Sequence, residues 1–130
     1  MINSEKHHRV AILGGAGGIG RALVTHLQAR GNDIVVLDLP ASIERHTLAT
    51  DAIAIDICDE ASVSDAFRTL ADKWENVDGF VNLAGYNSVL TPIGETTTDY
   101  FDEITGGNLR GAFVATKDVL PLRADGGADV

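Results

Sequence analysis

The stretch that decides the fold is LGGAGGIG, residues 13–20. It follows a short β-branched run, RVAIL at 9–13, and it precedes a segment with apolar residues at helical spacing, 18–30. Five of the seven residues from Gly14 to Gly20 are glycine, which permits a tight turn and lets the backbone approach a ligand closely. A strand, a glycine-rich turn and a helix in this order predict a dinucleotide-binding unit, with the pyrophosphate at the helix N-terminus.

Beyond this unit, short apolar runs alternate with helical patterns. Strands are expected at residues 33–39, 52–57 and 77–83. Helices are expected at 59–74, 97–104 (capped by a threonine) and 107–122, with a weak helix or loop at 41–50, a turn at 125–128 and a new strand from Val130. This alternation predicts parallel βαβ units, and the continuous apolar strands predict a sheet covered on both faces. The expected fold class is α/β, a Rossmann-type doubly wound parallel sheet of about four strands plus the start of a fifth.

Composition narrows the classes of partner. The net charge of −9 argues against nucleic acid and anionic membrane surfaces, which select for Lys and Arg. No apolar run reaches the roughly 18 residues of a membrane span, and the polar N-terminus has no signal-peptide core. Cys58, the only cysteine, is expected as a small buried residue, and a reducing cytoplasm is the expected compartment. No cluster has metal-ligand spacing, so no metal site is expected.

Two acidic residues follow the second and third predicted strands. Asp38 can accept hydrogen bonds from the hydroxyls of an adenosine ribose and would repel a 2′-phosphate, so NAD is expected in preference to NADP. Asp56 is expected to contact the adenine amino group beside the backbone of Ile57. The alternatives are a solvated strand-end aspartate for Asp38 and an ordinary acidic loop for Asp56.

The fourth predicted strand ends in Asn82-Leu83-Ala84-Gly85. An asparagine within this apolar run must satisfy its amide, and we expect Asn82 to do so by linking neighbouring strands. Ala84 and Gly85 leave the backbone open to a ligand.

Taken in order, these motifs resemble the short-chain dehydrogenase/reductase family. Its TGxxxGxG pattern is matched by Gly14, Gly18 and Gly20, its two acidic positions by Asp38 and Asp56, and its NNAG by NLAG at 82–85. Leu13 replaces the family's Thr, and Leu83 replaces its second Asn. Because Gly17 is present, the loop also fits the TGxxGxxG of the epimerase type, but NLAG and NLRGAF at 108–113 favour the shorter reductase type. The predicted cofactor-binding residues are Gly14, Gly17, Gly18, Ile19, Gly20, Asp38, Asp56, Ile57, Asn82, Ala84 and Gly85.

The resemblance also implies a catalytic role for Asn108, at a locally irregular place in a helix, where it would hold a water in a proton relay. The alternative is a helix cap. The family's Ser and its YxxxK pair have no counterpart here. Tyr86 and Tyr100 are followed four residues later by Leu90 and Ile104 rather than by Lys.

We therefore expect residues 1–130 to form one incomplete NAD(P)-binding Rossmann domain without the C-terminal catalytic part. The resemblance implies an NAD-dependent oxidoreductase for a small alcohol/carbonyl pair, inactive in this form. The alternatives are a non-catalytic dinucleotide-binding module and a fragment of an extended-type epimerase or dehydratase. With the fourth strand as an exposed edge, we expect a homo-oligomer or a marginally stable monomer.

Overall fold

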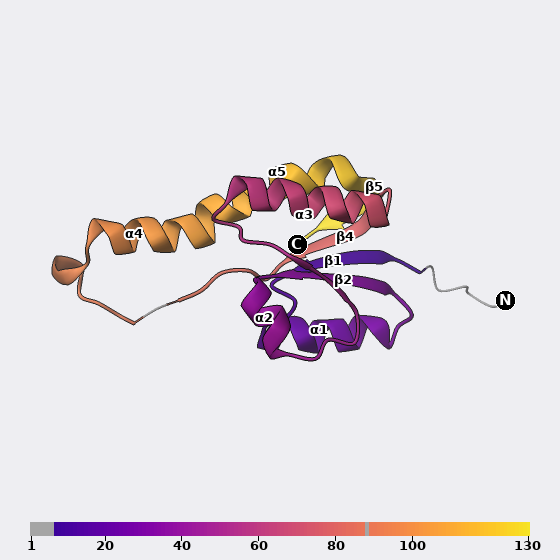
Figure 1. Ribbon diagram of the computed structural model, residues 1–130, viewed down its shortest axis with the longest axis horizontal. Coiled ribbons are helices and arrows are strands. Elements are labelled where there is room, and N and C mark those ends of the chain that lie inside the picture. Colours follow the sequence, from indigo (N-terminus) through magenta and orange to yellow (C-terminus); the bar gives the residue numbers. More distant parts are fainter. Residues whose placement is uncertain (1–6, 88) are drawn as a thin grey trace.

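The structure, a computed structural model, describes residues 7–87 and 89–130. A five-stranded parallel sheet of order β3-β2-β1-β4-β5 lies between two helical layers, with α1 and α2 on one face and α3 and α5 on the other (Figure 1). The strands are β1 Arg9–Leu13, β2 Asp33–Asp38, β3 Asp51–Ala54, β4 Val77–Asn82 and β5 Arg123–Asp129. The α-helices are α1 Gly18–Gln28, α2 Pro40–Arg45, α3 Glu60–Lys73, α4 Thr98–Thr105 and α5 Gly111–Val119. A π-helix, η2 Gly106–Arg110, joins α4 to α5, and η1 Ile93–Glu95 and η3 Leu120–Leu122 are 3₁₀ turns. The predicted doubly wound α/β class is confirmed.

The central strands are buried on both faces, as their continuous apolar sequences predict. Because side chains alternate along a strand, Ile12 of β1 packs on the α1 side and Leu13 on the α3–α5 side. On the α3–α5 side Phe67 and Phe80 meet edge to face, with ring centroids 5.8 Å apart. The core therefore fixes β1 and β2, whose carboxyl ends carry the glycine loop and Asp38.

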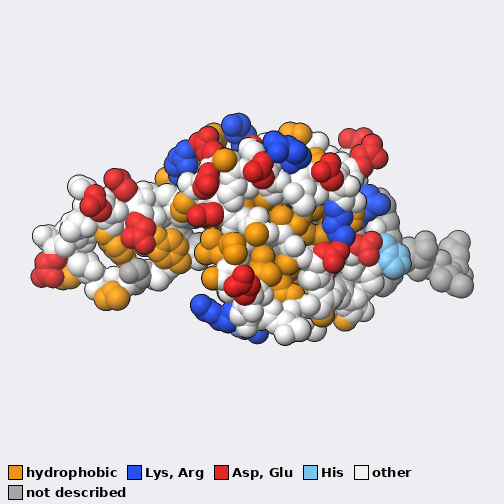
Figure 2. Space-filling model, in the orientation of Figure 1, with side chains coloured by type: hydrophobic (Ala, Val, Ile, Leu, Met, Phe, Trp, Pro, Cys, Tyr) orange, Lys and Arg blue, Asp and Glu red, His pale blue; other side chains and the backbone are white. Residues whose placement is uncertain are grey.

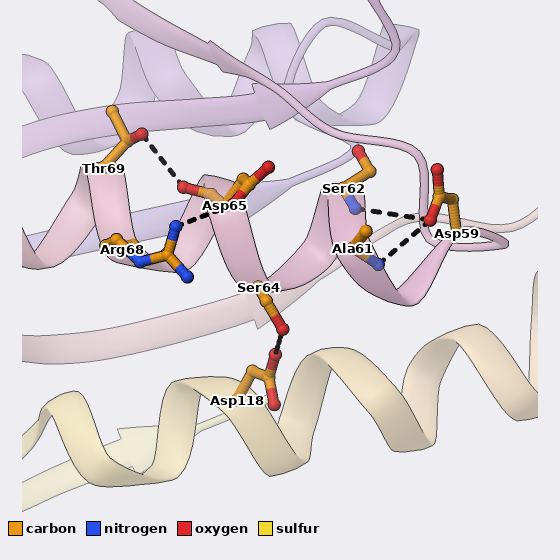
Figure 3. A network of polar contacts seen from close by, with 8 residues as sticks. All are labelled: Asp59, Ala61, Ser62, Ser64, Asp65, Arg68, Thr69 and Asp118. Carbon is orange, nitrogen blue, oxygen red and sulfur yellow. Dashed lines mark hydrogen bonds and ion pairs between the residues drawn. The ribbon is translucent and has the colours of Figure 1, made fainter.

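Helix α3 begins directly after the loop that follows β3 (Figure 3). The side chain of Asp59 accepts hydrogen bonds from the backbone N–H groups of Ala61 and Ser62, which gives the first turn its cap. Ser64 donates to the Asp118 carboxylate of α5 across 3.1 Å, so the two helices are joined at their exposed edges as well as in the core. The Asp59 cap fixes the position of the loop at the carboxyl end of β3.

The C-terminal segment differs from the sequence prediction. Residues 125–128, expected as a turn, fall within β5 instead, but only Arg123, Ala128 and Asp129 pair in parallel with β4. The residues between them bulge out of the ladder around Gly126, which has φ +76°. The ladder continues through Val130, whose N–H donates to Phe80 O at 2.8 Å and whose carbonyl accepts from Asn82 N–H at 2.7 Å. The exposed edge expected for β4 is also wrong, and β5 takes the edge position. The backbone groups of β4 require hydrogen-bond partners, and they find them in a segment whose side chains have low strand propensity.

Smaller differences concern the ends of elements. The predicted helix at 107–122 is divided into η2, α5 and η3, β3 ends at Ala54, and the helix expected within 41–50 is the six-residue α2. The Thr97 cap of α4 is confirmed, since its hydroxyl accepts from Tyr100 N–H at 3.1 Å. Helix α4 projects away from the body, on the side toward which β1 runs (Figure 1). None of the helices in the described residues is long and apolar enough to cross a membrane.

Candidate functional site

A cleft of about 360 Å³ lies at the carboxyl ends of β1, β2 and β4, which is where open α/β sheets bind ligands. On this face, hydrophobic side chains gather between the two helical layers (Figure 2). Seven of the predicted site residues line the cleft: Gly14, Gly17, Asp38, Asp56, Ile57, Ala84 and Gly85. The lining residues that the sequence did not predict for the site are Leu13, Leu39, Ser42, Ile55, Cys58, Leu83, Tyr86 and Gly107. Most of these are chain neighbours of predicted residues, and that adjacency is the signal that could have found them.

The glycine loop is shaped by contacts that only glycine permits. Gly14 has φ +78°, and a Cβ there would lie 2.8 Å from the backbone of Leu83 and Ala84. A Cβ on Gly20 would clash with the carbonyl oxygen of Gly14. Gly17 is the N-cap of α1 and offers no side-chain cap, so the first-turn N–H groups remain available to an anion. The loop therefore fits a pyrophosphate, with Gly20 buried beneath it and Ile19 exposed on its outer side.

Asp38 ends β2 beside this loop, and it is only half-buried. Its Oδ2 accepts from Ala16 N–H at 3.0 Å, and its Oδ1 accepts from Leu39 N–H at 2.8 Å. A carboxylate oxygen can accept two hydrogen bonds, so each oxygen can still accept one from a hydroxyl in the cleft.

The loop after β3 forms the opposite wall. Asp56 Oδ1 accepts from Cys58 N–H at 2.9 Å, and Asp56 N–H donates to Ser62 Oγ at 2.8 Å. The prediction that Cys58 is buried is wrong, because its side chain is exposed at the cleft. The loop is too open to enclose it. Partial desolvation and the neighbouring Asp56 carboxylate raise the pKa of the Cys58 thiol, which keeps it protonated and poorly nucleophilic near neutral pH.

Asn82 satisfies its amide locally. Its Oδ1 accepts from Ala84 N–H at 2.9 Å, two residues along the chain. The predicted link between neighbouring strands is wrong for this oxygen, because the chain turns at the end of β4 and brings a nearer donor to it. The bond holds Ala84 and Gly85 in the turn that lines the cleft.

Asn108 lies in the π-helix η2, and the irregularity expected at this position is present. Its Nδ2 donates to the carbonyl oxygens of Tyr86 and Ile104, both at 2.9 Å, and its Oδ1 accepts from Tyr86 N–H at 3.1 Å. A Cβ on Gly85 would lie 2.5 Å from the same Oδ1. The side chain therefore clamps the loop after β4 onto the π-helix instead of capping a helix start.

Tyr86 reinforces this clamp. Its hydroxyl donates to the Glu103 carbonyl oxygen at 3.2 Å, and its ring lies where a Cβ on Gly107 would come within 2.7 Å of Cε1. Desolvation of the hydroxyl, followed by its interaction with the Glu103 side chain, raises the pKa of Tyr86 to about 12. A phenol so held stays protonated at physiological pH and has its proton engaged with a carbonyl, which suits a structural role rather than proton transfer. Within residues 7–87 and 89–130, no group of acidic, His and Cys side chains could hold a metal ion.

Comparison with known proteins agrees with this geometry. A family model described as enoyl-(acyl carrier protein) reductase matches residues 14–130. The fold also superposes on a variant of the short-chain dehydrogenase/reductase of Serratia marcescens with a TM-score of 0.81 and 27% identity, covering 94% of this chain and 53% of that one. The chain belongs to the short-chain dehydrogenase/reductase family.

Relatives within the family differ in their named activities. The 2-dehydro-3-deoxy-L-rhamnonate dehydrogenase (NAD(+)) of Sphingomonas sp. (strain SKA58) is 28% identical, over 89% of this chain and 48% of its own length. The 3-ketoacyl-(acyl-carrier-protein) reductase of Brucella melitensis, solved in complex with NADH, is 29% identical with a TM-score of 0.80, covering 88% of this chain and 50% of that one. This short-chain dehydrogenase/reductase chain thus spans about half the length of these relatives.

Proposed function

We propose that this chain is the NAD-binding portion of a short-chain dehydrogenase/reductase that acts on a small alcohol/carbonyl pair. One observation carries the proposal: the Asp38 carboxylate lies against the glycine loop in the same cleft, hydrogen-bonded to Ala16 N–H. A carboxylate at this place can accept hydrogen bonds from the ribose hydroxyls, and its negative charge repels a 2′-phosphate. The names of two relatives, one NAD(+)-dependent and one complexed with NADH, support the same preference.

Different groups of predicted site residues would contact different parts of the dinucleotide along the cleft. The amides that open α1, at Gly18, Ile19 and Gly20, would hold the pyrophosphate, with Gly17 leaving room for it. Asp38 would accept the adenosine ribose hydroxyls. The chain after β3, at Asp56 and Ile57, would border the adenine, and the turn after β4 would face the nicotinamide half. When bound, the cofactor would supply or accept the hydride, and these residues would bind and orient it.

We propose that the proton for the carbonyl oxygen comes from a group other than those that line the cleft in residues 7–87 and 89–130. The Tyr86 hydroxyl is engaged with Glu103 O and has its pKa raised to about 12, so it does not meet the requirement for an acid poised near the working pH. We propose that Asn108 positions the loop that borders the nicotinamide, and that these 130 residues bind the cofactor without turnover.

Calorimetric titration of the purified chain with NADH and with NADPH tests this function. We expect NADH to bind and NADPH to bind more weakly. Binding of neither dinucleotide would refute the cofactor role, and tighter binding of NADPH would overturn the role of Asp38.

The second candidate is a non-catalytic dinucleotide-binding module, favoured by the engaged hydroxyl of Tyr86. A turnover assay with NADH and a panel of small ketones and aldehydes, run on this chain and on any longer form encoded with it, separates the two. Turnover by the longer form alone supports the oxidoreductase. Binding without turnover by every form supports the module. Turnover by these 130 residues contradicts both candidate functions, because each leaves the Tyr86 hydroxyl without a role in proton transfer.

A further inference from the structure

The glycine loop is held to β2 at two successive positions, and one of them is a side chain. Gly14 N–H donates to the backbone carbonyl of Leu37 at 2.7 Å. Ala16 N–H donates to the carboxylate Oδ2 of Asp38 at 3.0 Å. The first contact depends on the backbone alone, whereas the second exists only because residue 38 carries an acceptor of the right length.

The backbone N–H of Ala16 requires a hydrogen-bond acceptor because the residue is buried. It is 1% exposed, it lies in the loop between β1 and α1, and it packs into the core cluster on the α1 face. A residue in such a loop has no ladder or helical partner for its N–H, and an unpaired N–H in a buried place is unfavourable. The Asp38 carboxylate therefore determines which way the Ala16 peptide faces.

The neighbouring residues leave the loop little freedom to satisfy Ala16 otherwise. A Cβ on Gly15 would lie 2.8 Å from Val36 Cγ2, so the loop already rests directly on β2. Gly17 N–H donates to Gly14 O at 3.2 Å and lines the cleft. Turning the Ala16 peptide outward would move Gly17 and, with it, the amides that open α1.

We propose that Asp38 is a positioning residue for the glycine loop in addition to its role toward the ribose. The hydrogen bond from Ala16 N–H to Asp38 Oδ2, called the latch below, holds the loop in its anion-binding conformation before any ligand binds. The inference deepens the proposed function and rests on it for the consequence in binding, but the latch itself is a property of the free chain. The Asp38 carboxylate would then determine both the preference for NAD over NADP and the conformation of the glycine loop.

The coupling gives two substitutions at this position different outcomes. Asp38→Asn removes the charge but keeps an amide oxygen that can accept from Ala16 N–H. The Leu39 N–H that loses its acceptor is exposed and can bond to water. Asp38→Ala removes the charge and the latch together. Loss of the charge alone favours NADPH relative to NADH, whereas loss of the latch weakens both dinucleotides.

Amide hydrogen exchange of the cofactor-free chain, followed by NMR, tests the latch. We expect Ala16 N–H to exchange about tenfold faster in Asp38→Ala, as for loss of one net hydrogen bond, and within about threefold of the parent in Asp38→Asn. The core amides of Ile12 and Val35 serve as controls for global stability. Unchanged Ala16 exchange in Asp38→Ala, or equal acceleration in the two variants, overturns the latch.

Calorimetry with NADH and NADPH on the same three proteins tests the coupling. We expect Asp38→Asn to narrow the preference for NADH over NADPH, and we expect Asp38→Ala to bind both dinucleotides more weakly than Asp38→Asn does. If Asp38→Ala binds NADPH as tightly as Asp38→Asn does, the loop does not need the latch for binding and the coupling is overturned. If the parent binds neither ligand, the proposed function fails, and the exchange of Ala16 still decides the latch. Should Asp38→Ala unfold, Asp38→Ser, whose hydroxyl is too short to replace the carboxylate, takes its place.

Discussion

Removal of the Asn108 clamp offers a sharp test of the site's architecture. Asn108→Ala deletes three hydrogen bonds, two to the backbone of Tyr86 and one to Ile104 O. Such bonds contribute about 0.5–1.5 kcal/mol each, and the low end applies because the Asn108 side chain is exposed and water can replace it. We expect a loss of roughly 1.5 kcal/mol in the free energy of unfolding. Urea denaturation with a fluorescence readout measures it.

Asn108→Asp distinguishes the clamp from a general effect of substitution. An ionised carboxylate keeps the acceptor for Tyr86 N–H, but it places negative charge against the carbonyl oxygens of Tyr86 and Ile104, each now 2.9 Å from Nδ2. We therefore expect Asn108→Asp to be less stable than Asn108→Ala by about 1 kcal/mol near neutral pH. Asn87→Ala, at an exposed asparagine of the same loop, is the matched control and should change stability little. An Asn108→Asp protein as stable as the parent would refute the donor role assigned to Nδ2.

Three further predictions concern other parts of the molecule. Gly15→Ala places a methyl group 2.8 Å from Val36 Cγ2, so we expect urea denaturation to show a loss of about 1–3 kcal/mol, partly restored by adding Val36→Ala. The raised pKa of Tyr86, about 12, means that its folded form favours the protonated phenol. The contribution of the protonated Tyr86 to the free energy of unfolding is complete below the ordinary tyrosine pKa of 10 and is lost as the pH rises toward 12. The Tm should therefore fall more between pH 9 and pH 11 in the parent than in Tyr86→Phe. Leu109 and Phe113 are 72% and 68% exposed, so we expect the chain to self-associate and Phe113→Asp to weaken the association. Sedimentation velocity at several concentrations measures it, and a parent that is monomeric throughout contradicts it.

The sequence predicted those parts of the fold in which local chemistry and tertiary structure agree. The strand RVAIL, the glycine turn and the apolar face of α1 each point to the same βα unit, and Asp38 follows from its place at the end of β2. The Thr97 cap was predictable because a cap is a contact between near neighbours in sequence.

The rest depended on contacts between distant segments. Residues 125–128 have the composition of a turn, yet they fall within β5, because the backbone of β4 supplies a pairing edge for Arg123, Ala128 and Asp129 on either side of a bulge. The choice of Asn82 between a local and a cross-strand partner depends on the path of the backbone after β4. The π-helix at Asn108 is stabilised by Tyr86, which lies 22 residues earlier in the chain, so no local pattern predicts their contact.

The central claim is that the glycine loop holds the pyrophosphate of a dinucleotide, and a matched pair of glycine substitutions tests it most directly. Gly17 has φ −73°, which alanine adopts readily, and its added Cβ would meet only Gly14 O, at 3.4 Å. Gly94, in η1, has no atom within 4 Å of its added Cβ and is not among the residues that line the cleft. Both variants should therefore fold, and equal thermal melts confirm that they do. We predict that calorimetry with NADH finds binding lost or at least about tenfold weaker in Gly17→Ala and unchanged in Gly94→Ala, because only the first methyl group enters the space for the pyrophosphate. Equal NADH affinity in both variants would contradict the assignment of the loop.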